Sequence, residues 1–199
     1  MSAATGVVAA DRARRTTTGP VLGMILFVAS EAMFFAAFFG AYFTLRAAAP
    51  VWPPAGTSHL EIGIATVLTI VLVTSSVVLQ AAVFVLRRGE LRKASVLILV
   101  TVLLGVSFLA LQAYDYSTLT LSIRQNVFGT LFYVMTGLHM AHVFGGVVFL
   151  GLVFVQSRTG ELTPSRFDSL EAGSIYWHFV DVVWLCLFTS FYLLTRGAA

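Results

Sequence analysis

The stretch Tyr176–Phe188 reads YWHFVDVVWLCLF and lies inside a final apolar run that is long enough to cross a membrane. Hydrocarbon makes polar groups costly, so His178 and Asp181 should not lie there without a partner or a purpose. They are three residues apart, which places them on one face of a helix. Trp177, Asp181 and Trp184 follow a similar face at i, i+4 and i+7. Two interpretations are open: a buried carboxylate–histidine pair that holds two helices in register, or a direct functional role.

The composition of the whole chain is that of an integral membrane protein. Apolar residues make up 58% of the 199 positions, charged residues make up 11%, and the mean hydropathy is +0.92. A soluble domain carries about 25% charged residues, so this balance excludes an ordinary soluble domain. A membrane-spanning helix needs about 20 apolar residues, and five such runs occur, at about 21–45, 61–86, 95–113, 127–156 and 175–195. They predict an all-α fold, a polytopic bundle of five transmembrane helices with antiparallel neighbours.

Basic residues are distributed unevenly between the predicted loops, and this distribution predicts the orientation of the chain. Nine of the twelve fall on one side, in the N-terminal tail at 1–20, the loop 87–93 and the loop 157–174, and three fall on the other, Arg46, Arg124 and Arg196. By the positive-inside rule the N-terminus is cytoplasmic and the C-terminus lies outside, as five spans require. The pI near 9.4 therefore reflects membrane topology, and we expect no nucleic acid partner.

Glu31 lies deep in the first predicted span. It is about ten residues from the start of that span, or roughly 15 Å at 1.5 Å per residue, which is close to the middle of a hydrocarbon core about 30 Å thick. A carboxylate at that depth should be protonated, hydrogen-bonded or ion-paired. We therefore expect Glu31 to have a role beyond packing.

His139 and His142 lie three residues apart in the fourth predicted span, just before a pair of glycines that would allow close helix packing. Two histidines on one helix do not make a metal site without further ligands. Both rings should lie at a depth similar to that of the two carboxyl groups. Pairs of Glu31 with His139, and of Asp181 with His142, are therefore allowed, and His178 is a third histidine that could pair with either carboxylate.

Two further features are expected to be structural. Gln112, Asp115 and Tyr116 share one face at the end of the third predicted span, where they would form a polar cap at the membrane boundary. Cys186 is the one cysteine of the chain and lies in the middle of the last span. It has no partner for an internal disulfide, and we expect it to be a small buried apolar residue.

Several segments together resemble subunit III of haem-copper cytochrome c oxidases. The matching positions are Gly23–Phe35 (the family's GMILF…SE…FF helix), Trp52–Pro54 (its proline-rich loop), Gly105, Phe108, Gln112 and Tyr116 (a helix end), Phe128–Thr130, Thr136, Gly137, His139 and His142 (its G…F…TG.H..HV..G helix), and Tyr176–Trp184 (YWHFVDVVW). The resemblance covers residues 20–195 in order. The last of these motifs is the most specific.

The chain also departs from the family pattern. Larger members have seven spans, and this chain resembles the short bacterial form without the first two, so the lipid-holding cleft that those helices build is not expected intact. Asp115 stands where the family usually has Glu. Gln80–Ala82 occupies a part of the second span that is polar and histidine-rich in many relatives, so any role of those histidines does not transfer.

The resemblance implies an integral, non-catalytic subunit of a terminal oxidase in a bacterial plasma membrane. Haem and copper are expected in subunits I and II, which move electrons from cytochrome c to dioxygen and pump protons. This chain would hold no cofactor, metal ion or catalytic residue, pack beside subunit I, bind phospholipid and support proton uptake. The residues expected to serve this role are Glu31, Gln112, Asp115, His139, His142, Trp177, His178, Asp181 and Trp184. A supercomplex with a cytochrome bc complex and the identity of the electron donor stay open.

Two other functions stay open on the residues alone. The first is a membrane cytochrome in which His139, His142 or His178 ligates haem, although no bis-imidazole arrangement on separate helices is evident. The second is a proton-coupled transporter that uses Glu31 and Asp181 as a relay, although the paired repeats and broken helices typical of transporters are not apparent.

Overall fold

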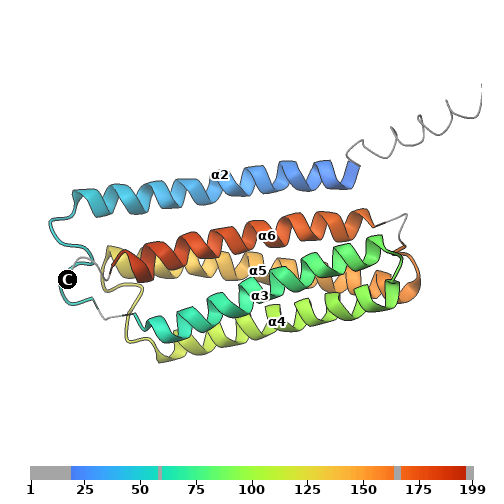
Figure 1. Cartoon of the computed structure of the whole chain (residues 1–199). Coiled ribbons are helices and arrows are strands. Elements are labelled where there is room, and N and C mark those ends of the chain that lie inside the picture. The colour runs from blue at the N-terminus through green and yellow to red at the C-terminus, as the bar shows by residue number, and fades with distance from the viewer. Residues whose placement is uncertain (1–18, 58–59, 164–166, 196–199) are drawn as a thin grey trace, which may run out of the picture.

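The computed structural model describes residues 19–57, 60–163 and 167–195 and consists of long helices that run side by side (Figure 1). They are α2 (Gly19–Ala48), α3 (Ile62–Arg87), α4 (Leu91–Thr118), α5 (Val127–Thr159) and α6 (Asp168–Phe188), and α6 continues into a short π-helical turn, η1 (Thr189–Leu193). Within the described residues there is no β-strand, and five helices are long and apolar enough to cross a membrane. The predicted all-α bundle with five spans is confirmed.

Local signals set the ends of α5 and the turn before α4. The side-chain oxygen of Asn126 accepts a hydrogen bond from the backbone N–H of Gly129 at 2.9 Å, which satisfies a group that the first turn of a helix leaves unpaired. Gly160 ends α5 with φ of 83°, a left-handed conformation that glycine adopts without strain. Gly89, with φ of 86°, makes the tight turn between α3 and α4.

Helices α2 and α4 extend beyond both ends of their predicted spans, and α5 and α6 beyond one end, because an apolar run does not include the polar turns at which a helix leaves the hydrocarbon. The largest difference is in α6, which begins at Asp168 rather than at 175. Asp168 and Glu171 lie in its first turn, where the helix dipole favours negative charge. Residues 1–18 of the predicted N-terminal tail lie outside the described residues, and the remainder of that tail, Gly19 and Pro20, already belongs to α2.

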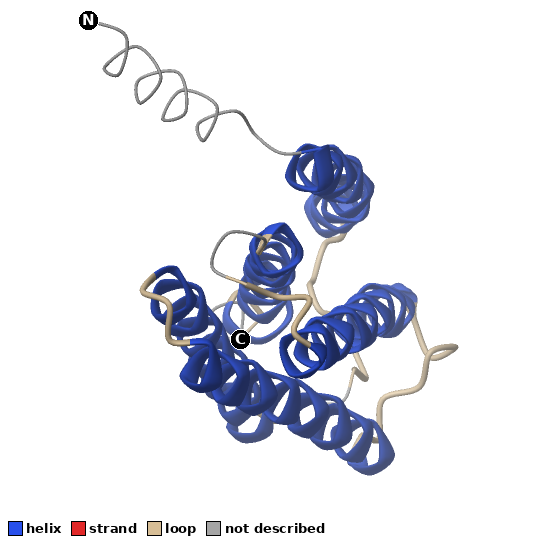
Figure 2. Ribbon diagram, turned by 90° about the vertical axis from the view of Figure 1, so that its right-hand side faces the viewer, coloured by secondary structure: helices blue, strands red, loops and turns tan. Residues whose placement is uncertain are grey.

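Helices α3 to α6 form the body of the bundle, and α2 lies at its edge. Each of the four packs against two others of the body, whereas α2 packs mainly against α6. The view in Figure 2 shows α2 set apart from the other four helices. The buried residues of α2 are Val21, Phe35 and Tyr42. Helix α2 is therefore attached to the body mainly through α6, and little of its side-chain surface is fully buried.

Trp177 fills the centre of the four-helix body. Its side chain is fully buried, and its indole N–H donates to the hydroxyl of Ser75 on α3 at 2.9 Å. The ring lies against Gly105 of α4 and Gly146 of α5, so closely that an added Cβ would lie 2.7 Å and 2.9 Å, respectively, from ring carbons. The close approach predicted for the glycine pair of α5 is thus present at Gly146.

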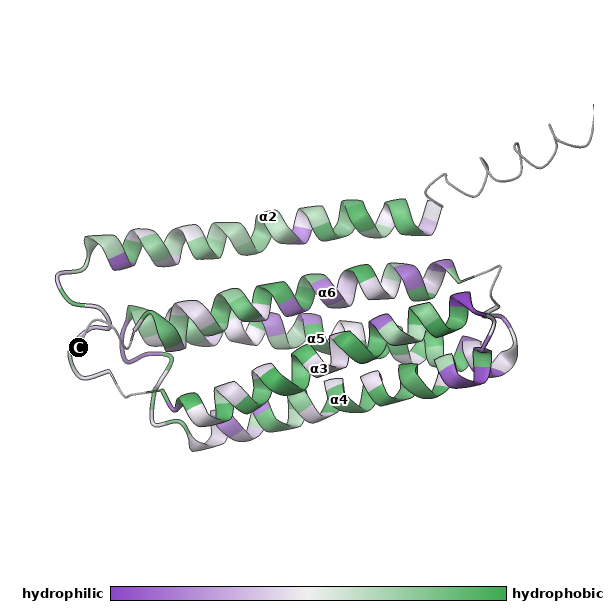
Figure 3. Cartoon of the chain, viewed as in Figure 1, coloured by the Kyte–Doolittle hydropathy of each residue, from purple (hydrophilic) through white to green (hydrophobic). Residues whose placement is uncertain are grey.

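Hydrophobic residues predominate along the helices, and hydrophilic residues gather at helix ends, most clearly in the α3–α4 turn (Figure 3). Many large apolar side chains are exposed on the outer surfaces of the helices. Met33 on α2 is 75% exposed and Val77 on α3 is 66% exposed. A surface of this kind suits hydrocarbon chains or neighbouring membrane helices rather than water.

Cys186 belongs to this outer surface, which corrects the prediction that it is buried. It is adjacent on α6 to Val182 and Leu185, which are also exposed. Positions i, i+3 and i+4 share one helix face, and this is the face of α6 that points away from the body.

Candidate functional site

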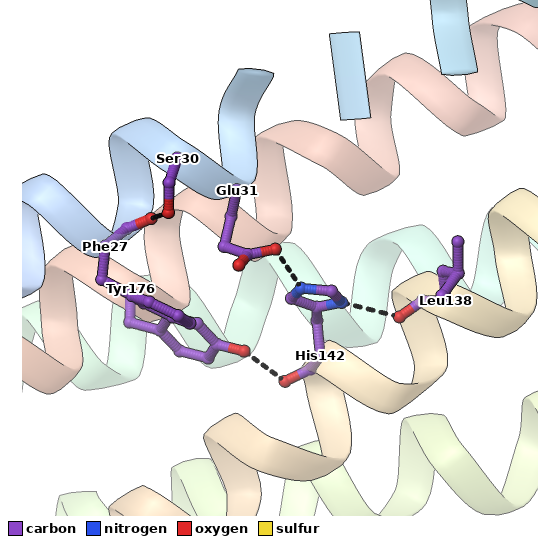
Figure 4. Close-up of polar contacts among 6 residues, drawn as sticks. All are labelled: Phe27, Ser30, Glu31, Leu138, His142 and Tyr176. Carbon is purple, nitrogen blue, oxygen red and sulfur yellow. Dashed lines mark hydrogen bonds and ion pairs between the residues drawn. The ribbon is translucent and has the colours of Figure 1, made fainter. Parts of the chain in front are cut away.

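Glu31 of α2 and His142 of α5 meet between the edge helix and the body (Figure 4). The carboxyl Oε2 of Glu31 lies 3.0 Å from Nε2 of His142. The other ring nitrogen, Nδ1, lies 2.8 Å from the backbone carbonyl oxygen of Leu138. From α6, the hydroxyl of Tyr176 donates to the backbone carbonyl of His142 at 3.0 Å. Side chains from two other helices, α2 and α6, therefore meet at this histidine of α5.

This geometry fixes the number of protons that Glu31 and His142 share. A carbonyl oxygen only accepts, so Nδ1 of His142 carries a proton. The bond between Nε2 and the Glu31 oxygen then requires one further proton, which lies on either atom. The pair is a neutral acid with a neutral imidazole, or a carboxylate with an imidazolium, and its net charge is zero in both cases. A single charge at this depth, with its unfavourable desolvation, is avoided.

The Glu31–His142 pair lies under aromatic rings and is still partly accessible. The side chains are 22% and 16% exposed, respectively. Phe35 packs its ring edge-on against the imidazole at 5.0 Å between centroids, and Phe27 stacks on Tyr176 at 6.1 Å. The pair is therefore accessible at the edge of the bundle while most of its surface is shielded.

His139 does not join this pair, so the predicted pairing of Glu31 with His139 is wrong. Its ring is fully buried between Trp184, with centroids 5.2 Å apart, and Phe108, at 5.8 Å. Neither ring nitrogen has a hydrogen-bond partner in the described part of the chain. Residues three apart differ by about 60° around a helix, and this angle turns His139 into the body and leaves His142 facing α2.

His178 and Asp181 lie on one helix face as predicted, but the carboxyl group is not the main partner of the histidine. Nδ1 of His178 lies 2.5 Å from the hydroxyl of Ser76, and Nε2 lies 3.2 Å from Oε1 of Gln80. The nearest atom of Asp181, Oδ2, is 4.0 Å from Nδ1. The predicted pairing of Asp181 with His142 is wrong. Helices α3 and α6 are joined here by a hydroxyl and an amide rather than by a carboxylate–histidine pair.

The two tryptophans of the predicted stripe also bond to α3. Trp184 donates its indole N–H to the hydroxyl of Thr69 at 3.0 Å, and Trp177 bonds to Ser75. The residues of α3 that bond to α6 are not among the predicted site residues. The spacing of Thr69, Ser76 and Gln80, at i, i+7 and i+11, is a polar stripe at helical period and was the available signal.

Gln112 and Asp115 lie near the end of α4 as predicted, but they point inward rather than forming a cap at the membrane boundary. Gln112 is fully buried and donates from Nε2 to Oδ2 of Asp115 at 3.3 Å. Tyr116 bonds to the hydroxyl of Thr136 on α5 at 2.6 Å, and that hydroxyl donates in turn to the backbone of its own helix. The polar end of α4 is therefore part of the α4–α5 interface.

A second attachment of α2 lies near the C-terminal end of that helix. Its residues are not among the predicted site residues. The hydroxyl of Tyr42 donates to the backbone carbonyl of Ser190 in η1 at 2.5 Å and accepts from Nε1 of Trp52 at 3.3 Å. Arg46 donates to the carbonyl of Leu194 at 3.2 Å. The acceptors are backbone atoms 148 residues further along the chain, and no sequence pattern identifies them.

None of the described histidines is arranged as an open metal ligand. His142 and His178 use both ring nitrogens for hydrogen bonds, and His139 is enclosed between rings. Among the residues that the structure describes, no group of three or more His, Cys, Asp and Glu side chains is close enough to hold a metal ion.

The sequence was compared with known proteins. The family profile described as Cytochrome c oxidase subunit III matches residues 3–196. A cytochrome c oxidase subunit 3 from Thermostichus vulcanus is 38% identical over 190 residues, which cover 95% of this chain and 94% of that protein. The corresponding protein of Corynebacterium diphtheriae is 38% identical over 179 residues, 87% of each chain. That of Synechocystis sp. is 36% identical over 175 residues, 87% of this chain and 75% of the relative.

Proposed function

We propose, because this chain belongs to the cytochrome c oxidase subunit III family, that it is a non-catalytic subunit which supports the oxidase during turnover. Subunits I and II would carry haem and copper and transfer electrons from cytochrome c to dioxygen. This multi-pass membrane subunit would pack beside subunit I, hold ordered phospholipid and stabilise proton uptake. The single observation that carries the proposal is the Glu31–His142 pair, which shares one proton at the partly accessible edge of the bundle.

The pair suits a supporting role in proton handling. It keeps zero net charge whichever atom holds the shared proton, so its proton can move between oxygen and nitrogen without placing a single charge in the membrane. A hydrogen-bonded pair of this kind could buffer protons near an uptake route in a neighbouring subunit. Among the described residues, no further side chain hydrogen-bonds to the Glu31 carboxyl group or to the His142 ring, as a continuous relay through this chain would need.

The packing and hydrogen bonds of the described histidines support the proposal that the chain itself ligates no haem. A haem iron needs a free imidazole nitrogen that points into a pocket, and His139, His142 and His178 are committed to packing or to hydrogen bonds. The absorption spectrum of the purified chain tests this directly. A Soret band that follows the chain, and that is lost in a histidine variant, would favour the membrane cytochrome instead.

The orientation in a bacterial plasma membrane is also part of the proposal. Helix ends alternate so that the start of α2, the α3–α4 turn and the α5–α6 loop share one end of the bundle (Figure 1). The basic residues in these segments would place this end in the cytoplasm. In a Cys186→Ser background, a membrane-impermeant maleimide applied to the outer face should label Thr120→Cys and not Glu90→Cys. Labelling of both from one face would contradict the orientation.

Co-purification tests membership of the complex. A tagged chain in mild detergent should bring the haem- and copper-containing oxidase subunits with it in a fixed ratio. Deletion of the chain should leave an oxidase that reduces dioxygen at first and then inactivates faster during turnover. A tagged chain that purifies without any haem-containing partner would contradict the proposed function.

A further inference from the structure

A groove lies between α3 and α6 on the outer surface of the body. It has a volume of about 570 Å³. Its rim carries Val77 and Val182, and its floor carries Asp181 beside His178. The rim residues are 66% and 58% exposed, respectively, whereas the Asp181 side chain is 9% exposed. An apolar groove therefore surrounds one almost fully buried carboxyl group.

One oxygen of the Asp181 carboxyl group lacks a hydrogen-bond donor among the described residues. This atom, Oδ1, is buried. Ser76 lies beside both Asp181 and His178, and its hydroxyl bonds to Nδ1 of His178 without reaching Oδ1 of Asp181. A carboxyl oxygen accepts in either charge state, and leaving a buried acceptor unsatisfied is unfavourable.

The depth of Asp181 restricts what could supply the donor. It lies six residues inside the apolar span that begins at residue 175, which corresponds to about 9 Å along the helix. The hydrocarbon core of a membrane is about 30 Å thick, so phospholipid headgroups lie at its faces and not at this level. Acyl chains reach the groove but have no donor. A neighbouring membrane helix can bring both apolar contact and a polar side chain to this depth.

We infer that the α3–α6 groove is the docking site for a transmembrane helix of another oxidase subunit, and that this helix places a side-chain hydrogen-bond donor opposite Asp181. The inference rests on the proposed function, since it requires a neighbouring subunit. A donor such as a Ser, Thr, Asn or Gln side chain would satisfy the carboxyl oxygen, and apolar neighbours on the same helix would fill the groove. Removal of the Asp181 carboxyl group should then destabilise the assembled complex more than it destabilises the fold of this chain.

Cross-linking in the intact complex tests this inference. Benzoylphenylalanine is introduced at Val77 or at Val182, with Asp181 unchanged, and at the exposed Val106 of α4 as a matched control. After illumination of the purified oxidase, both groove positions should form adducts with the same helix of one partner subunit, and that helix should carry a polar donor. The Val106 position should not form this adduct.

The rate at which the chain leaves the complex in detergent provides a second readout. Asp181→Leu should raise this rate at least tenfold, whereas Asp181→Asn, which retains an acceptor oxygen, should change it less than threefold. If the chain co-purifies and the groove positions cross-link only to lipid, or if Asp181→Leu leaves the rate unchanged, the docking site is excluded and the proposed function stands. A chain that does not co-purify would remove both.

Discussion

Glu31 and Asp181 are both acidic residues deep inside membrane-spanning helices, and the bundle accommodates them in opposite ways. Glu31 lies on the edge helix and is the more exposed, yet it has a histidine partner on another helix at 3.0 Å. Asp181 lies on the most buried helix, and its Oδ1 has no hydrogen-bond partner in the described part of the chain. Of these two carboxyl groups, the more buried one is therefore the less completely hydrogen-bonded.

The difference reflects how the two helices are held. Helix α6 is held both by shape, with Trp177 seated against two glycines, and by several hydrogen bonds to α3, so its attachment does not require the Asp181 carboxyl group. Helix α2 has few fully buried side chains. Of the hydrogen bonds that join it to the body, Glu31–His142 lies nearest the middle of the helix. Substitutions in the body and at the edge should consequently have different consequences.

The largest effect is expected where a substitution breaks the packing of the body. Gly146→Ala places a methyl group 2.9 Å from ring carbons of Trp177, which are held by the surrounding core. Overpacking of this kind costs about 1–3 kcal/mol, and the upper end of that range is expected because the methyl group would also meet Tyr176. The thermal midpoint of the subunit in the purified complex should fall. Gly151→Ala, on the same helix with open space around it, is the control and should leave the midpoint almost unchanged. Equal effects would mean that Trp177 does not determine the fit.

A smaller effect is expected at the edge. Glu31→Ala leaves Nε2 of His142 without its partner, and the loss of one partner of a buried hydrogen bond costs about 1–3 kcal/mol. Because the rest of the bundle does not depend on this bond, amide hydrogen exchange should accelerate in α2 and not in α4. Glu171→Ala, which breaks the exposed ion pair with Arg87, should have little effect. Uniform acceleration across all helices would contradict the separation of edge and body.

The smallest effect is expected at the second attachment of α2. Tyr42→Phe removes a hydroxyl that makes two hydrogen bonds; the shorter one, to Ser190, contributes about 1 kcal/mol, and the longer one, from Trp52, contributes less. Hydrogen exchange should accelerate near η1 and the end of α2. Tyr114→Phe, at a tyrosine that is 59% exposed, should leave the exchange unchanged. An effect at Tyr114 as large as that at Tyr42 would show that the hydroxyl bond is not specific.

The number, order and approximate limits of the five helices could be predicted from the sequence, because long apolar runs are unambiguous in a membrane protein. The partners of the polar residues could not. Depth alone allowed both His139 and His142 for Glu31, and only the rotation of α5 relative to α2 decides between them. The exposure of Cys186 depends in the same way on which face of α6 packs against the body. Rotation about the helix axis is set by packing across the whole bundle and leaves a weak trace in hydropathy.

The measurement that tests the account most directly is the turnover of an oxidase that carries Glu31→Gln. The amide can still donate to Nε2 of His142 but cannot release a proton, so docking of α2 is preserved and the shared proton is lost. In an assembled complex with its full complement of haem and copper, dioxygen reduction should begin at a rate close to that of the unmodified oxidase. Proton uptake should then be altered, or inactivation during turnover faster. An immediate and complete loss of dioxygen reduction in that complex would place Glu31 on the essential proton route and contradict a supporting role.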